Sequence, residues 1–236
     1  MNLILGRFAR MAFGVALLAT VALASTASAY TLRSPQVAFQ NASLQGLLNG
    51  WDGGITTLTD QIDGQNFAVN VSGNADFTLM IKLGGNAANN TIGVYNAGDP
   101  SPALCPLFPS YAIADYSVYC HFKASGALAV DLYDQNNTKL GTTNFSGVTR
   151  NQIGFYIDGP NGTKYSQDYR NLGKPQVLTY AGTGANGNDL FECFNDATYD
   201  PGTSTFDSAV LMLESVVPKP VPTINKSWGS LKAQYR

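Results

Sequence analysis

The chain has few charged residues, and basic residues are the scarcer kind. Only 13% of its 236 residues are charged, with 14 Lys and Arg against 16 Asp and Glu, and the formal net charge is -2 at pH 7. No Lys or Arg occurs between Lys174 and Lys219. A protein that binds nucleic acid needs a basic patch to neutralise phosphates. The composition therefore predicts no nucleic-acid partner.

Histidine is nearly absent, which excludes most nucleophilic mechanisms. His121 is the only histidine, and it lies beside Cys120 in a strand-like segment. A Ser-His-Asp or Cys-His mechanism would have to use it. The sequence contains no GxSxG, HExxH, P-loop or strand-linked GxGxxG motif. We therefore predict that the chain is not an enzyme, while hydrolysis of polysaccharide by two carboxyl groups stays open as an alternative.

Long apolar runs are absent after residue 29. Before it, Arg7 and Arg10 form a basic region, residues 11–24 are apolar, and residues 27–29 (ASA) resemble a cleavage site. This pattern predicts a signal peptide over residues 1–29, because the apolar run is shorter than the ~20 residues that span a membrane. An uncleaved anchor is the alternative. We expect a secreted chain that starts at Tyr30 and has no membrane span after the signal is removed.

The chain has only three cysteines, Cys105, Cys120 and Cys193. Export permits disulfides, and Cys105 and Cys120 bracket a Pro- and Tyr-rich loop, so we predict that these two form a bridge. Cys193 is then a buried apolar thiol or part of an intermolecular bridge. Pairings that include Cys193 remain open.

The pattern of the mature chain predicts strands and turns. Short segments of alternating polar and apolar residues lie between clusters of Gly, Asn, Asp and Pro, which is typical of a sandwich or jelly roll. Residues 43–50 read as a helix, with Ser43 as a possible N-cap and Gly50 at its end. We predict an all-β antiparallel β-sandwich or jelly roll with one short N-terminal helix. The predicted strands are 67–71, 76–83, 117–122, 127–133, 152–157, 176–180 and 206–216.

This predicted domain covers residues 43–217. Residues 30–42 form an extended segment before it, and residues 218–236 form a Pro-rich linker and a polar tail. Inside the domain, residues 92–95 (IGVY) and 153–156 (IGFY) echo each other. The echo suggests equivalent strands of two packed sheets, although chance similarity between two short β segments explains it as well.

Acidic residues are concentrated where basic ones are missing. Glu192, Asp196, Asp200 and Asp207 lie within this stretch with no counter-charge, so a bound cation would relieve their repulsion. Carboxylates and nearby Asn and backbone oxygens are the ligands that Ca²⁺ takes. We predict that these four residues bind Ca²⁺, although the spacing is not that of an EF-hand. The alternative is a solvated acidic loop that aids solubility.

Several features together resemble a known family: residues 43–50, 92–95, 153–156 and 164–166, Asn171 and the acidic stretch. The chain is similar to an exported bacterial domain of unknown function that is common in PEP-CTERM surface and biofilm-matrix proteins. The resemblance implies a calcium-type acidic signature, in which Glu192 matches the opening Glu and residues 206–207 match its end, whereas Cys193 stands where a second acid is expected. Residues 223–236 lack the family's sorting signal, so we expect release or non-covalent retention.

These observations favour a secreted, non-catalytic component of an extracellular matrix, surface or filament, stabilised by Ca²⁺. We expect it to associate with itself or with other matrix components. Leu32, Val37 and Phe39 have the β character to complete the sheet of a neighbouring molecule. The alternative is a carbohydrate-binding or carboxylate-dependent hydrolysing jelly roll, with polysaccharide as its partner. Its sugar-stacking residues would be Trp51, Tyr111, Tyr116 and Tyr119.

Overall fold

The structure is a computed structural model that describes residues 30–69, 77–84, 89–123 and 126–219; for residues 77–84 it describes the backbone. The predicted signal peptide and most of the predicted tail lie outside these ranges. Within them the chain forms one helix, α1 (Ala42–Trp51), two short 3₁₀ helices and fourteen strands. No helix in the described part is long and apolar enough to cross a membrane.

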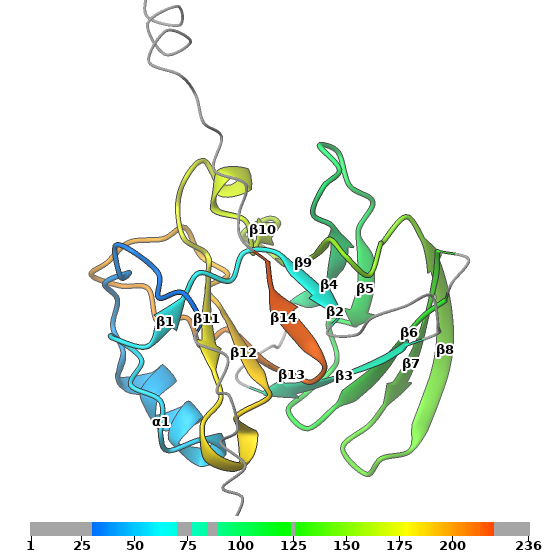
Figure 1. Cartoon of the computed structure of the whole chain (residues 1–236), viewed down its shortest axis with the longest axis horizontal. Helices are drawn as coiled ribbons and strands as arrows, with labels where there is room; N and C mark the ends of the chain where they lie inside the picture. Colours follow the sequence, from blue (N-terminus) through cyan, green and yellow to red (C-terminus); the bar gives the residue numbers. More distant parts are fainter. Residues whose placement is uncertain (1–29, 70–76, 85–88, 124–125, 220–236) are drawn as a thin grey trace, which may run out of the picture.

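Two antiparallel sheets contain all the strands. The larger has the order β1-β11-β12-β13-β3-β6-β7-β8, and the smaller has the order β14-β2-β9-β4-β5, with β10 attached to β9 (Figure 1). In the larger sheet these strands are β1 (Gln61–Ile62), β11 (Val177–Ala181), β12 (Leu190–Phe194), β13 (Ala209–Leu213), β3 (Phe77–Gly84), β6 (Ser117–Phe122), β7 (Ala127–Tyr133) and β8 (Lys139–Ser146). In the smaller sheet they are β14 (Val216–Pro218), β2 (Phe67–Val69), β9 (Ile153–Asp158), β4 (Thr91–Asn96), β5 (Cys105–Phe108) and β10 (Lys164–Tyr165).

The main hydrophobic core lies between the two sheets. Phe67, Val94 and Phe155 from the smaller sheet share one buried cluster with Val118 and Leu211 from the larger sheet. In strands such as β6, buried and partly exposed side chains alternate, as expected for a sheet with one face on the core. The prediction of an all-β antiparallel fold with one short helix is confirmed, and the arrangement is consistent with a β-sandwich.

A second core covers the outer face of β11, β12 and β13. Leu44 and Leu48 of α1 pack there against Tyr180, Phe191 and Val210. These strands are therefore buried on both faces, which explains why residues 209–213 are apolar without alternation. The helix starts one residue earlier and ends one residue later than predicted, and Ser43 is not its N-cap. The Ser43 hydroxyl donates to Asp207 instead, and Asn41 occupies the N-cap position without a side-chain bond.

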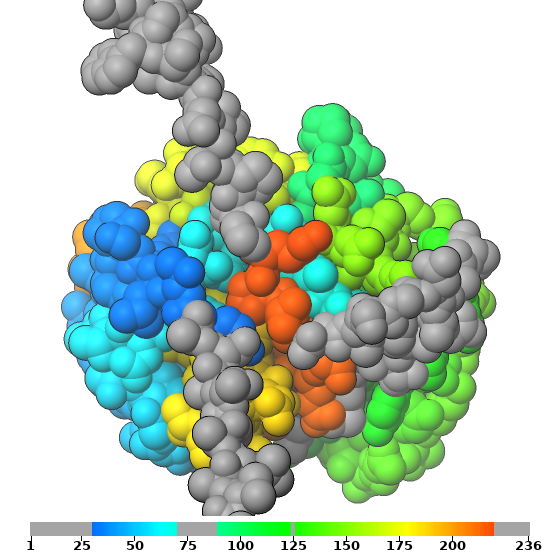
Figure 2. Space-filling view, in the orientation of Figure 1, coloured from blue at the N-terminus to red at the C-terminus, as the bar shows by residue number. Residues whose placement is uncertain are grey.

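The N-terminal segment belongs to the sandwich, which corrects the prediction that it is available for assembly. Val37 and Phe39 are 8% and 7% exposed in the second core, and the Phe39 ring packs edge-on against Phe206 at 5.2 Å. Leu32 is 57% exposed, but its backbone forms an antiparallel bridge with Ile62. Figure 2 shows the blue N-terminal segment lying against the cyan segment that follows it. Val37 and Phe39 complete this chain's own core rather than a neighbour's sheet.

The two echoing segments lie in one sheet, not in two packed sheets. They are β4 and β9, which pair directly, with Tyr95 opposite Gly154 and Gly93 opposite Tyr156. The Tyr side chains need this arrangement, because a Cβ at Gly154 would overlap the Tyr95 ring and a Cβ at Gly93 would overlap the Tyr156 ring. The two segments are alike because the tyrosine of each strand packs over the glycine of the other.

The end of the chain also differs from prediction. Residues 206–216 do not form one strand, because Phe206 and Ser215 have positive φ angles of 54° and 65°. These left-handed positions bend the backbone before β13 and between β13 and β14. β12 was not predicted, since Glu192 interrupts its apolar pattern.

Candidate functional site

Glu192, the first predicted Ca²⁺ ligand, lies in the main core. Its neighbours at alternate positions on β12, Leu190 and Phe194, both belong to the cluster between the sheets, so Glu192 faces the same way. The residue is fully buried, and its Oε1 lies 2.5 Å from the Thr179 hydroxyl on β11. Among the described residues, Oε2 has no hydrogen-bond partner.

The contacts of Thr179 indicate that Glu192 is protonated. The Thr179 hydroxyl has one proton, and its Oγ1 also lies 2.6 Å from the carbonyl oxygen of Gly64, which can only accept. If Thr179 donates to Gly64, the carboxyl group of Glu192 must donate to Thr179. Burial raises the pKa of Glu192 well above its ordinary value, and the Thr179 hydroxyl and the Arg33 charge only partly offset this.

The other three predicted ligands lie around the loop that joins β12 to β13. Asp196 accepts from Asn90 Nδ2 at 3.0 Å and from Ser208 Oγ at 2.9 Å. Asp207 accepts from the hydroxyls of Ser43 and Thr205. Each of these carboxylates already has donors of its own.

Asp200 closes a turn in the same loop. Its Oδ1 accepts from the backbone N–H of Gly202 at 2.7 Å, and its own N–H donates to Ser204 Oγ at 2.9 Å. The structure thus places Asp196, Asp200 and Asp207 on one loop but leaves Glu192 in the core, and the described residues contain no group of three or more metal-binding side chains. The structure therefore does not bring all four predicted ligands together.

The predicted Cys105–Cys120 disulfide is absent from the structure. Cys105 lies on β5 of the smaller sheet and Cys120 on β6 of the larger one, and both are unbonded and buried in the main core. Cys193 is likewise unbonded and buried, in the second core. Burial raises the pKa of all three thiols. This places them with inert, apolar cysteines.

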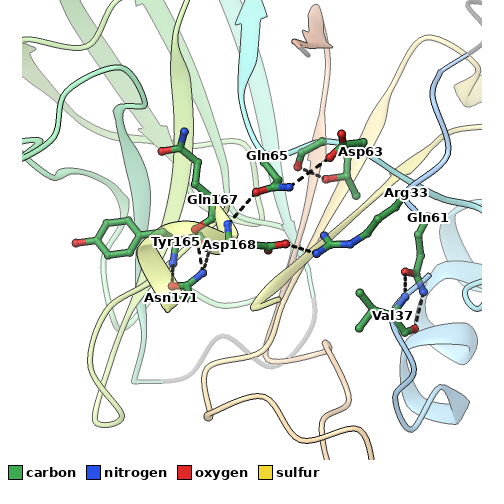
Figure 3. Close-up of polar contacts among 11 residues, drawn as sticks. Arg33, Val37, Gln61, Asp63, Gln65, Tyr165, Gln167, Asp168 and Asn171 are labelled. Atoms are coloured by element: carbon green, nitrogen blue, oxygen red, sulfur yellow. Dashed lines mark hydrogen bonds and ion pairs between the residues drawn. The ribbon is translucent and has the colours of Figure 1, made fainter. Parts of the chain in front are cut away.

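A polar cluster joins the N-terminal segment to the 3₁₀ helix Asp168–Asn171 (Figure 3). The Arg33 guanidinium donates to Asp168 Oδ2, with side chains 12% and 21% exposed. The Asp168 N–H donates to Gln65 Oε1 at 2.9 Å, and Gln65 Nε2 reaches Asp63 Oδ1 at 3.3 Å. Burial raises the pKa of Asp168, because it outweighs the attraction of Arg33.

Gln61 fixes the same segment from the other side. Its Oε1 accepts from the Val37 N–H at 2.7 Å and its Nε2 donates to the Val37 carbonyl at 2.9 Å, so the side chain pairs with the backbone as a strand would (Figure 3). Gln61 is fully buried, and its Nε2 also lies 3.1 Å from the Thr57 carbonyl. The sequence contains no local sign of this role.

A cleft of about 620 Å³ opens beside this network. Two buried oxygens of its lining residues, Gln36 Oε1 and Asp168 Oδ1, have no hydrogen-bond partner among the described residues. Asp63 and Tyr199 also line the cleft. Both oxygens are buried from solvent, so the groups that suit a polar ligand are the side chains of Arg33, Asp63 and Gln65 with the Tyr199 ring.

Three residues that carry the family resemblance, Tyr95, Tyr165 and Asn171, belong to a second polar cluster. Gln167 Oε1 accepts from Tyr95 and from Arg170 Nε, and the Arg170 guanidinium lies 5.1 Å from the centre of the Tyr95 ring. Asn171 accepts from the Tyr165 N–H at 3.0 Å and donates to the Tyr165 carbonyl at 2.7 Å. These contacts hold the 3₁₀ helix onto β4 and β10.

The remaining predicted residues are dispersed. His121 Nε2 lies 3.5 Å from Asp131 Oδ2, which Lys139 approaches at 2.8 Å. Trp51 packs on Phe191 at 5.9 Å, and Tyr119 packs on Tyr133 at 5.2 Å. Tyr111 is exposed and Tyr116 packs against the main core. The four predicted sugar-stacking residues do not line the cleft.

Neither a scan against protein-family models nor a search of curated proteins finds a match to this chain.

Proposed function

We propose that this chain is a secreted, non-catalytic β-sandwich that serves as a component of an extracellular matrix, surface or filament. One observation supports this proposal best: the carboxylates of the candidate site tie distant parts of the chain together. The contacts Ser43–Asp207, Arg33–Asp168 and Asn90–Asp196 link residues that are 164, 135 and 106 positions apart.

Such contacts suit a mechanical role. A hydrogen bond to a charged group contributes about 1.5–3 kcal/mol, and contacts between distant segments resist local opening. A catalytic acid or base instead needs a reachable proton and a reacting atom beside it. Asp196 and Asp207 are each engaged by two donors of the chain itself.

The proposed role does not require Ca²⁺. The resemblance implies a cation at the acidic stretch, but Glu192 is buried in the main core beside Thr179. The donors that surround Asp196 and Asp207 are protein amide and hydroxyl groups. Hydrogen bonding within the chain replaces the counter-charge that the sequence lacks.

Localisation tests the proposal. Cultures of the producing bacterium are separated into cytosol, membrane, surface, matrix and medium, and the chain is detected with an antibody. We expect it in the matrix, surface or medium fraction, and we expect a deletion strain to form a matrix of lower cohesion. Confinement of the chain to the cytosol would contradict the proposal, as would turnover of a polysaccharide by the purified chain.

The cleft supports a second candidate, carbohydrate binding. Its lining includes the polar side chains of Arg33, Asp63 and Gln65, with which sugar hydroxyls can exchange hydrogen bonds. We would measure binding of the full chain to a glycan array and then titrate the best glycan by calorimetry. Asp63→Asn, at the cleft, should weaken binding at least about tenfold, whereas Asp134→Asn, in the loop between β7 and β8, should not. Equal affinity of both variants would contradict this candidate.

A further inference from the structure

The strand orders of the two described sheets end in four strands, three of which are short and protected, while the two-residue β10 lies outside these orders on β9. β1 has two residues and is covered by the Leu32–Ile62 bridge. β14 has three residues and ends at Pro218, and β5 has four residues with Pro106 among them. Proline has no N–H to offer a neighbouring strand. Natural proteins use such short edges and prolines to prevent pairing between molecules.

The fourth edge, β8, is long and exposed. It has eight residues, seven of them exposed and the eighth, Phe145, half-buried. In the described part of the chain β8 pairs only with β7. Figure 1 shows it at the outer rim of the larger sheet.

The hydrogen-bonding pattern identifies which groups of β8 point outward. The Lys123 N–H donates to the Ala127 carbonyl across the turn between β6 and β7, so Ala127 faces β6. Because backbone direction alternates along a strand, Leu128 and Val130 face β8 and pair with Phe145 and Thr143. The N–H and C=O groups of β8 that point away from β7 therefore belong to Thr142, Asn144 and Ser146, which lie between and beyond Thr143 and Phe145.

We propose that β8 pairs antiparallel with β8 of a second copy of this chain, centred on Thr143. A two-fold axis at this residue places Thr143 opposite its own copy, Thr142 opposite Asn144, and Gly141 opposite Phe145. Each pair keeps its side chains on the same face, as an antiparallel sheet requires. The two larger sheets become one continuous sheet.

The composition of β8 favours a copy of itself over another partner. Residues 141–146 carry no charge, and the single charged residue of the strand, Lys139, lies at its end. No like charges therefore oppose each other in this register. Thr–Thr pairs and an aromatic residue across glycine are both favourable between antiparallel strands.

The core side of β8 also has room for the second copy. β5, the last strand of the smaller sheet, lies against β7. A Cβ at Gly141 would meet no atom within 4 Å. The half-buried Phe145 of each molecule can therefore cover Gly141 of the other and lose its remaining exposure to water. The inference rests on this edge and not on the proposed function, so a different cellular location would leave it unchanged.

Sedimentation equilibrium of the full chain over a concentration series tests the pairing. We expect a monomer–dimer equilibrium for the wild type. Asn144→Pro removes an outward N–H without touching the bonds to β7, and edge strands tolerate such a proline. It should raise the dimer dissociation constant at least about tenfold without lowering the melting temperature of dilute protein. Asn144→Thr, which keeps the N–H, should dimerise as the wild type does.

A disulfide cross-link tests the register independently. Thr143 forms a non-hydrogen-bonded pair with its copy, in which Cα atoms are about 4.5 Å apart, a distance that a disulfide spans. Thr143→Cys should therefore form a covalent dimer on mild oxidation. Thr142→Cys should not, because its copy lies on a diagonal about 7–8 Å away. A wild type that stays monomeric at all concentrations, or a dimer that Asn144→Pro leaves intact, would overturn the proposal.

Discussion

The ring of Tyr95 lies over Gly154, its direct partner on the neighbouring strand, and fills the space that a side chain there would occupy. Tyr156 does the same over Gly93. Both tyrosines are almost fully buried, and the Tyr95 hydroxyl donates to Gln167 at 3.0 Å. The centre of the smaller sheet thus depends on two glycines within its strands.

Gly154→Ala should lower the free energy of unfolding by about 1–3 kcal/mol, because the added methyl group displaces the Tyr95 ring from a packed site. The measurement is a urea denaturation of both proteins. Gly46→Ala is the matched control: Gly46 lies in α1 with nothing within 4 Å of its Cβ position, so alanine there should stabilise the protein by up to about 1 kcal/mol. Equal effects at the two positions would contradict the packing described.

Glu192→Gln should stabilise the protein at neutral pH. Burial raises the pKa of Glu192 in the folded state, so the folded chain holds this proton more tightly than the unfolded chain. Stability due to this group therefore falls as the pH rises above the ordinary value of 4.5, and it keeps falling until the folded pKa is reached. Glutamine keeps a donor for Thr179 and does not ionise.

Melting temperatures of wild type and Glu192→Gln between pH 4 and pH 8 measure this effect. The two curves should meet near pH 4 and diverge as the pH rises, with the variant more stable by about 1.4 kcal/mol for each unit by which the pKa is raised. Glu214→Gln, at a partly exposed carboxyl group, should diverge less. Parallel curves would show that Glu192 is ionised and solvated.

Arg33→Ala should destabilise the protein by about 2–3 kcal/mol, between the values for exposed and fully buried ion pairs. The loss arises because Asp168 is left without its cation in a largely buried position. Adding Asp168→Asn should recover part of the loss, since a neutral amide is cheaper to bury than a lone carboxylate. Chemical denaturation of the wild type, the two single variants and the double variant gives a double-mutant cycle for this pair. Additive losses would mean that the two side chains do not interact.

Ca²⁺ should not raise the melting temperature. Glu192 is in the core, and the loop carboxylates each bond to donors of the chain. Melts of the full chain in EDTA, in Ca²⁺ and in Mg²⁺ at equal ionic strength should coincide within a degree. A rise specific to Ca²⁺ that Asp207→Asn abolishes would restore the site predicted from the sequence.

The thiols should be free and unreactive in the folded protein. Cys105, Cys120 and Cys193 are unbonded and buried, and burial raises the pKa of each, so little thiolate is exposed to reagent. An aromatic disulfide reagent should label almost none of them in buffer and all three in guanidinium chloride. If only one thiol reacts in denaturant without reductant, a disulfide is present after all.

Much of the fold could be predicted from the sequence, and little of the site. The helix near residues 43–50 and the strands near 117–122 and 127–133 were found because their patterns are local. β12 was missed because Glu192 breaks its apolar run, yet Thr179 on the adjacent strand makes a carboxyl group acceptable there. The charge of Asp207 predicts a metal ligand, but in the structure Asp207 accepts a hydrogen bond from Ser43. The sequence predicts Ser43 to be the N-cap of the helix instead.

By itself the sequence determined that the fold is built of strands and, for segments such as 117–122 and 127–133, which face is apolar, because alternation with a period of two is a property of neighbouring residues. Tertiary structure alone decided that the two echoing segments pair in one sheet and that Arg33 meets Asp168 across 135 positions. It also left β8 as the long open edge. The physical reason is that pairing depends on which distant surfaces exclude water together, and that choice is made by the whole packed chain rather than by any one segment.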